Sequence, residues 1–168
     1  MKFMVNCDVL FFHNFKEKLA VFVSKYDVGI EELIKYFKYP YIEFSIRNKV
    51  KGNIIIFKNE EIKNNFVKEF KVILEEEKQN DTLNIEKRHM LVGNYMGFPP
   101  KAVEYFSCEK YKTKDTNSPI NISMNYYGLY FASYPETIEE DIKWLEDTYS
   151  KKFINNTIDQ LKTYEILI

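Results

Sequence analysis

The sequence predicts an α+β fold in which an antiparallel sheet of about four strands packs against several short to medium helices. Alternating hydrophobicity, typical of strands, occurs over residues 41–47 and again from Ile120 to Phe131, and segments with apolar residues at helical spacing lie between them. The strands come in hairpin-like pairs and the helices in blocks, unlike the strict alternation of a parallel sheet. With 168 residues, 45% of them hydrophobic, the chain is expected to form a single domain over residues 1–168.

Two short helices are predicted before Pro40, after a short strand over residues 1–6. Asn14 and Glu17 form a capping box ahead of an apolar stripe, which predicts a helix from Asn14 to about residue 23. Apolar residues then recur at helical spacing from Ile30 until Pro40 stops the run.

The helix pair over residues 19–37 has about the length of a DNA-reading motif. Its second helix begins with Glu31 and Glu32, at the end that would approach phosphates, and like charge opposes such docking. A plain helical hairpin is therefore expected there.

Two strands are predicted next, joined by a turn over residues 48–52. Residues 53–58 include three consecutive isoleucines, so this strand is expected to be buried on both faces and more central than its partner. The partner, residues 41–47, has an apolar face and an opposite face that carries Tyr41, Glu43 and Ser45.

Three helices should follow. Asn59 is a suitable N-cap for a long helix that ends in the polar loop at residues 78–81. A second helix runs from about Leu83 to Gly97, and a third begins near Pro100. The side chains of the third helix that are expected to pack are Ala102, Val103 and Phe106.

The last third of the chain begins with a polar loop over residues 109–118. A strand then continues from Ile120 to Phe131 with Gly128 as a bulge, and a helix starts near Thr137. A further helix over 153–162 and an apolar tail over 164–168 complete the prediction. The expected buried stripe of the helix after Thr137 is Ile138, Ile142, Leu145 and Tyr149.

Composition and charge disfavour nucleic-acid binding. Lys plus Arg is 24 and Asp plus Glu is 25, so the net charge is −1 and no strong field attracts phosphate backbones. Arginine, which reads bases with a bidentate fork, occurs only as Arg47 and Arg88. The exception would be the lysine-rich loop, whose candidate contacts are Lys110, Lys112 and Lys114.

The sequence also predicts a cytoplasmic protein with reduced cysteines, Cys7 and Cys108. No apolar run approaches the roughly 18 residues of a membrane helix, and no cleavage site for a signal peptide follows the N-terminal stretch. Frequent asparagine, lysine, isoleucine and tyrosine with few alanines are typical of AT-rich codons. This composition indicates a low-GC bacterium or one of its phages.

His89 is the main catalytic candidate. It shares a helical stripe with Ile85, Val92 and Met96, so its imidazole is predicted to face inward, beside Gly93. A buried histidine near a substrate carboxylate or phosphate can act as a general acid or base. The alternative is a core histidine satisfied by one backbone carbonyl.

The string from Gly93 to Pro100, GNYMGFPP, predicts a sharp corner between two helices. Such corners are more often architectural, and this glycine spacing is not that of a phosphate-binding loop. A rigid corner can also position a site, and ligand contacts would first be sought at Asn94, Tyr95 and Lys101.

No metal or cofactor site is expected. The two cysteines lack CxxC spacing, and two histidines with scattered acids make no recognisable ligand set. The acidic clusters at residues 75–77 and 139–141 are expected to be solvated helix surfaces.

Tyrosine is frequent, with 13 residues, and several tyrosines fall where the apolar pattern does not need them. Exposed tyrosine is enriched at protein interfaces, although AT-rich codons also raise its frequency. The expected contact surface is a face of the sheet that carries Tyr41, Glu43, Tyr126, Tyr130 and Tyr134.

We therefore expect a non-enzymatic accessory or regulatory protein that binds another protein, or a second copy of itself as a homodimer, through this tyrosine-bearing face. The first alternative is a small hydrolase or transferase that uses His89 near the corner. The second is a nucleic-acid-binding protein that uses the lysine-rich loop. No cofactor and no membrane partner are expected.

Overall fold

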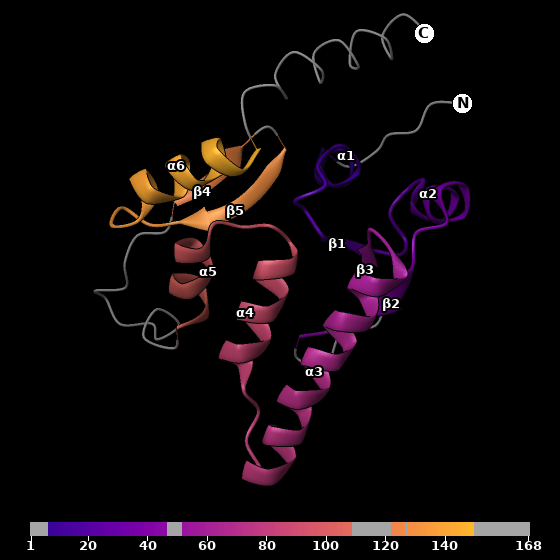
Figure 1. The fold of residues 1–168 in the computed structure, drawn as a ribbon, viewed down its shortest axis with the longest axis horizontal. Coiled ribbons are helices and arrows are strands. Elements are labelled where there is room, and N and C mark those ends of the chain that lie inside the picture. Colours follow the sequence, from indigo (N-terminus) through magenta and orange to yellow (C-terminus); the bar gives the residue numbers. More distant parts are fainter. Residues whose placement is uncertain (1–6, 47–51, 109–121, 127, 150–168) are drawn as a thin grey trace, which may run out of the picture.

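The computed structural model describes residues 7–46, 52–108, 122–126 and 128–149. Within these ranges the chain forms six helices and two small antiparallel sheets, which confirms the α+β class (Figure 1). The expected sheet of about four strands is instead divided into a sheet of three strands and a sheet of two. The predictions for residues 1–6, 109–118 and 153–168 lie outside the described residues.

The described elements follow one another along the chain, and their bounds are as follows. They are α1 (Cys7–Asn14), β1 (Ala20–Ser24), α2 (Ile30–Phe37), β2 (Tyr41–Glu43), β3 (Asn53–Phe57), α3 (Glu60–Asn80), α4 (Ile85–Tyr95), α5 (Pro100–Ser107), β4 (Ile122–Tyr126), β5 (Leu129–Ser133) and α6 (Ile138–Tyr149).

The first sheet has the order β1-β3-β2, so the predicted central position of the isoleucine-rich strand is confirmed. Ile54 and Ile56 of β3 face α1 and α2, where they pack with Val9, Phe12 and Leu33. Ile55 and Phe57 face the other way and pack against α3 and α4. The sheet is thus covered by helices on both faces, which explains why β3 lacks a polar side.

Residues 14–23 do not form the predicted helix. Asn14 is the last residue of α1, and Ala20–Ser24 form β1, which pairs antiparallel with β3 from Ala20↔Phe57 to Ser24↔Asn53. Val21 packs on the side of α1 and α2, whereas Ala20 packs on the side of α3 and α4. This pairing with a distant strand outweighs the local capping pattern. The predicted helical hairpin over residues 19–37 is therefore wrong, and so is the helix pair considered for reading DNA.

The long helices α3 and α4 begin as predicted. The side chain of Asn59 accepts a hydrogen bond from the Ile62 N–H at 2.9 Å, and Asn84 caps α4 in the same way through the Lys87 N–H at 3.0 Å. The two helices lie side by side and extend beyond the edge of the first sheet (Figure 1). Their inner faces supply half of the buried side chains of the core on that side.

The GNYMGFPP corner joins α4 to α5. A Cβ added at Gly93 would lie 2.7 Å from a methyl group of Val103, so the close approach of α4 and α5 requires glycine there. Gly97 has φ 71°, and the Tyr149 hydroxyl donates to its carbonyl oxygen at 2.7 Å. The corner is therefore locked to α6, which favours its architectural interpretation.

The second sheet is a hairpin of β4 and β5, not one continuing strand. The chain reverses between Tyr126 and Leu129, which pair directly, and Gly128 has φ 102° within the turn. The Asn125 side chain accepts from the Gly128 N–H at 2.8 Å and closes this turn. Gly128 thus supports a reversal instead of the predicted bulge. The hairpin packs against α1, α5 and α6 in a separate apolar cluster.

Two side chains predicted to be buried are exposed. Phe106 on α5 is 50% exposed and Ile142 on α6 is 38% exposed. On α6 the inward position is taken by Asp141, which is 1% exposed and accepts hydrogen bonds from β5, from α5 and from Thr137, the residue before α6. The buried stripe is consequently shifted by one residue at this turn, while Leu145 and Tyr149 are buried as predicted.

Candidate functional site

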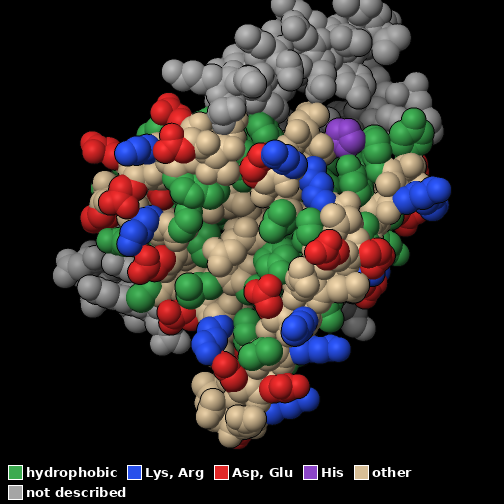
Figure 2. Space-filling view, in the orientation of Figure 1, with side chains coloured by type: hydrophobic (Ala, Val, Ile, Leu, Met, Phe, Trp, Pro, Cys, Tyr) green, Lys and Arg blue, Asp and Glu red, His purple; other side chains and the backbone are tan. Residues whose placement is uncertain are grey.

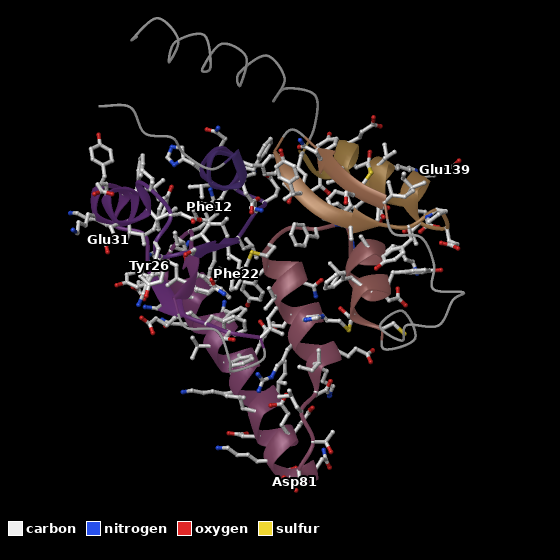
Figure 3. All side chains as sticks on the ribbon, turned by 180° about the vertical axis from the view of Figure 1, so that it is seen from behind. Phe12, Phe22, Tyr26, Glu31, Asp81 and Glu139 are labelled. Carbon is white, nitrogen blue, oxygen red and sulfur yellow. The ribbon has the colours of Figure 1, made fainter. Side chains whose placement is uncertain are left out.

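Exposed large apolar side chains concentrate around α2. The exposed fractions are 75% for Tyr26, 73% for Val28, 81% for Tyr36, 42% for Phe37 and 51% for Tyr41. We call these five residues the α2 surface. All of them lie within residues 26–41, immediately before, on or after α2. Tyr26 and the neighbouring Glu31 project outward on the same side of the molecule (Figure 3).

The local sequence explains why α2 presents this surface. Gly29 adopts φ 83° and starts the helix, and the αL conformation of Lys38 ends it ahead of Pro40. Ile30 and Leu33 turn toward the sheet and are buried. Because the helix is only eight residues long, this narrow inward stripe leaves most of its other side chains in solvent.

The C-terminal end of α2 carries a cluster of aromatic rings in mutual contact. The ring of Phe37 lies 4.9 Å from that of Tyr36, 5.5 Å from that of Tyr39 and 4.5 Å from that of His13. His13 Nδ1 is 2.8 Å from the Tyr39 hydroxyl. Figure 2 shows a histidine with hydrophobic side chains beside it on this face of the molecule. These contacts restrict the rotation of the partly exposed rings.

The charge state of this cluster is set by its neighbours. Burial and the nearby Lys58 ammonium lower the pKa of His13, so its imidazole is neutral at pH 7. Burial raises the pKa of Tyr39, whose hydroxyl therefore stays protonated. Burial also lowers the pKa of Lys58 to about 8, while its amine caps α1 by donating to the His13 carbonyl at 3.2 Å.

At the edge strand β2, polar and aromatic side chains meet around Lys25. Its ammonium lies 3.0 Å from Glu43 Oε1 and 5.5 Å from the centre of the Tyr26 ring. The hydrogen bond with Glu43 is the main cause of the raised pKa of Lys25, and Tyr26 and Tyr41 add to it. The structure thus brings the predicted Tyr41 and Glu43 together with Tyr26, which the sequence did not suggest.

The predicted tyrosine face is divided between the two sheets. Tyr41 and Glu43 belong to β2, whereas Tyr126 and Tyr130 belong to β4 and β5 (Figure 1). Tyr130 is 57% exposed, and its hydroxyl accepts from Asn125 Nδ2 at 2.9 Å. Tyr134 is buried, with its ring 5.0 Å from that of Tyr105, so the expectation that it is exposed is wrong.

The corner residues named as candidate ligand contacts lie in different environments. Tyr95 is buried, and its hydroxyl donates to Glu69 Oε1 at 2.6 Å; burial is the main cause of its raised pKa. Lys101 is exposed and pairs with Glu104 at 3.2 Å. The candidate nucleic-acid contacts Lys110, Lys112 and Lys114 lie outside the described residues.

His89 is half-buried and packs on α5, its ring 5.1 Å from that of Phe106. The deeply buried residue of this turn is its neighbour Arg88, which is 1% exposed. Arg88 is drawn inward by Glu77 of α3, a long-range pairing that helical spacing alone does not reveal. The catalytic role of His89 stays a prediction.

A groove of about 440 Å³ lies at the turn between α3 and α4. Two of its three carboxylates are already compensated, because Glu77 accepts two hydrogen bonds from Arg88 and Glu76 pairs with Lys87. Across the described ranges, no group of three or more His, Cys, Asp or Glu side chains is placed to hold a metal ion. The groove lining is Glu76, Glu77, Asn80, Thr82, Leu83, Asn84, Ile85 and Glu86.

We expect the contribution of Glu77 to the unfolding free energy to be lost in acid. Hydrogen bonds from Arg88 hold its pKa below the usual value of 4.5, so the folded state binds this proton more weakly than the unfolded state. The stabilisation is therefore complete above about pH 4.5 and is lost as the pH falls further. Urea denaturation should show a difference in unfolding free energy between the wild type and Glu77→Gln that is constant from pH 7 to 5 and shrinks below. A difference that persists unchanged to pH 3 would contradict this.

Comparisons with protein-family models, curated proteins and solved structures find no match for this chain. Among the helices of the described residues, none has the length and apolar character needed to cross a membrane.

Proposed function

We propose that this protein is a protein-binding module and that the α2 surface is its contact surface. The observation that carries the proposal is the gathering of five large exposed apolar side chains within residues 26–41. At about 200 Å² per fully exposed aromatic side chain, the three tyrosines of this surface present on the order of 400 Å². Patches of about 300–600 Å² are often functional in monomeric proteins.

The shape and chemistry of the α2 surface favour a macromolecular partner over a small ligand. It is formed by a short helix and an edge strand, whereas the groove lies elsewhere, between α3 and α4. Tyrosine supplies a large contact area and a hydroxyl at a low entropic cost. The ring contacts around Phe37 lower that cost further, because ordering the rings is partly completed in the free protein.

Site-specific photocrosslinking tests this proposal. Tyr36 is replaced by photoreactive benzoylphenylalanine, with the same replacement at Val72, which is 51% exposed on α3, as the matched control. We expect position 36 to give a discrete adduct in cells and position 72 to give none. The adduct should weaken when Tyr26→Ala and Tyr41→Ala are added, since both rings belong to the same surface. Equal adducts at both positions, or none at position 36, would show that the α2 surface is not a contact surface.

A further inference from the structure

We propose that the partner of the α2 surface is a second copy of this chain, related by a two-fold axis that places α2 antiparallel to its counterpart. This inference rests on the proposed function and names the partner for the same surface. In a two-fold interface the same patch meets itself, so the patch must be complementary to its own rotated copy.

The charges of α2 meet this requirement. Its exposed first turn carries Glu31 and Glu32, and its exposed C-terminal end carries Lys35 and Lys38. An antiparallel arrangement sets the acidic turn of each copy against the basic end of the other, so both ends are attractive. The dipoles of the two helices then point in opposite directions, so the positive end of each helix lies beside the negative end of the other, which is favourable. A partner with one sign of charge would be repelled at one end.

None of these four charged side chains is paired within the described part of the chain. Among the described residues, Glu31, Glu32, Lys35 and Lys38 form no ion pair, although Glu31 and Lys35 stand four residues apart. Other exposed lysines of the fold do pair, as Lys25 does with Glu43. The charges of α2 are therefore available for contacts with a second copy.

The apolar residues follow the same symmetry. Tyr26 and Val28 lie at the N-terminal end of α2, and Tyr36 and Phe37 lie at its C-terminal end. The antiparallel arrangement brings the first pair of one copy toward the second pair of the other. With the four long charged side chains added, the surface approaches the roughly 800 Å² per partner of a standard interface. A dissociation constant on the order of micromolar is expected for such a contact.

Charge swapping tests the inference in the full-length chain by sedimentation velocity. The wild type should form a species of twice the 20.2 kDa of one chain. Glu32→Lys and Lys35→Glu should each weaken the dimer about tenfold, because each change acts twice across the axis. An equimolar mixture of the two variants should recover a dimer, and so should the double variant Glu32→Lys/Lys35→Glu. Lys143→Glu, an equal charge change on the exposed side of α6, should leave the dimer unaltered.

A chain that stays monomeric at every concentration would overturn the inference, as would a dimer that ignores both swaps or variants that do not recover on mixing. Circular dichroism of each variant checks that the exposed substitutions leave the fold intact. The proposed function fails separately: if position 36 crosslinks to a different protein while the purified chain remains monomeric, the α2 surface is a binding surface but its partner is not a second copy.

Discussion

The Arg88→Met variant is expected to lose about 3–5 kcal/mol of unfolding free energy, because it leaves the Glu77 carboxylate buried without its partner. Arg88 donates from Nε and Nη2 to the two oxygens of Glu77, at 2.8 and 2.6 Å, and from Nη1 to the Ile46 carbonyl at 2.8 Å. Its guanidinium also lies 5.2 Å from the centre of the Phe70 ring. Methionine fills a similar volume but satisfies none of these acceptors. Urea denaturation at pH 7 measures the loss.

Lys87→Met is the matched control. Lys87 stands next to Arg88 on α4 and pairs with Glu76, the neighbour of Glu77, but both side chains of this pair are exposed. An exposed pair contributes about 0.2–1 kcal/mol, so a small effect is expected there. If Lys87→Met and Arg88→Met lose equal amounts of unfolding free energy, burial does not explain how strongly the Arg88–Glu77 pair stabilises the fold.

The double variant Glu77→Leu/Arg88→Met removes both charges. It therefore separates the attraction between Arg88 and Glu77 from the cost of leaving the Glu77 carboxylate buried without a partner. Replacing both members of a buried ion pair with apolar side chains is often nearly neutral. We therefore expect the double variant to be more stable than Arg88→Met alone, although the Asn84 N–H, which donates to Glu77 Oε1 at 2.8 Å, also loses its acceptor. A double variant less stable than Arg88→Met would contradict this account.

Elements set by local chemistry could be predicted from the sequence. The N-cap at Asn59 and the isoleucine run of β3 depend on residues that are close together in the chain. The structure confirms both the cap and the central position of β3. β1 could not be predicted in this way, because only its pairing with β3 distinguishes residues 20–24 from a helix. Arg88 and Asp141 were missed for a related reason: each is buried by a partner on another element.

The candidate site was predictable only where exposure follows from strand alternation. Tyr41 and Glu43 alternate with apolar residues of β2, and the structure places both in solvent. The exposure of Tyr26 does not follow from the sequence, because the pattern before it predicts a helix, whereas those residues form β1 and Tyr26 follows the end of that strand. Tyr95 and Tyr134 are buried instead, since an aromatic ring with a hydroxyl suits either environment and neighbouring elements decide between them.

Asp141→Ala is expected to cost about 3–4 kcal/mol, because it orphans three buried donors at once. Asp141 Oδ2 accepts from the Ser133 hydroxyl at 2.6 Å and from the Thr137 hydroxyl at 3.0 Å, and Oδ1 accepts from the Ala102 N–H at 3.2 Å. The last of these is an N–H in the first turn of α5, so α6 supplies the carboxylate that caps another helix. One side chain thus connects β5, α5 and α6.

Asp147→Ala is the matched control, because Asp147 lies on the same helix but is exposed. It separates the effect of the three hydrogen bonds to Asp141 from the effect of helix propensity. Both variants exchange aspartate for the better helix former, which favours the variant by a few tenths of a kcal/mol. Asp147→Ala should therefore change stability by no more than about 0.5 kcal/mol, in either direction. Thermal denaturation of the two variants measures the contrast. If Asp141→Ala has the same melting temperature as Asp147→Ala and the wild type, the three hydrogen bonds do not hold the hairpin of β4 and β5 to the helices. The packing around Leu129 and Leu145 must then hold it alone.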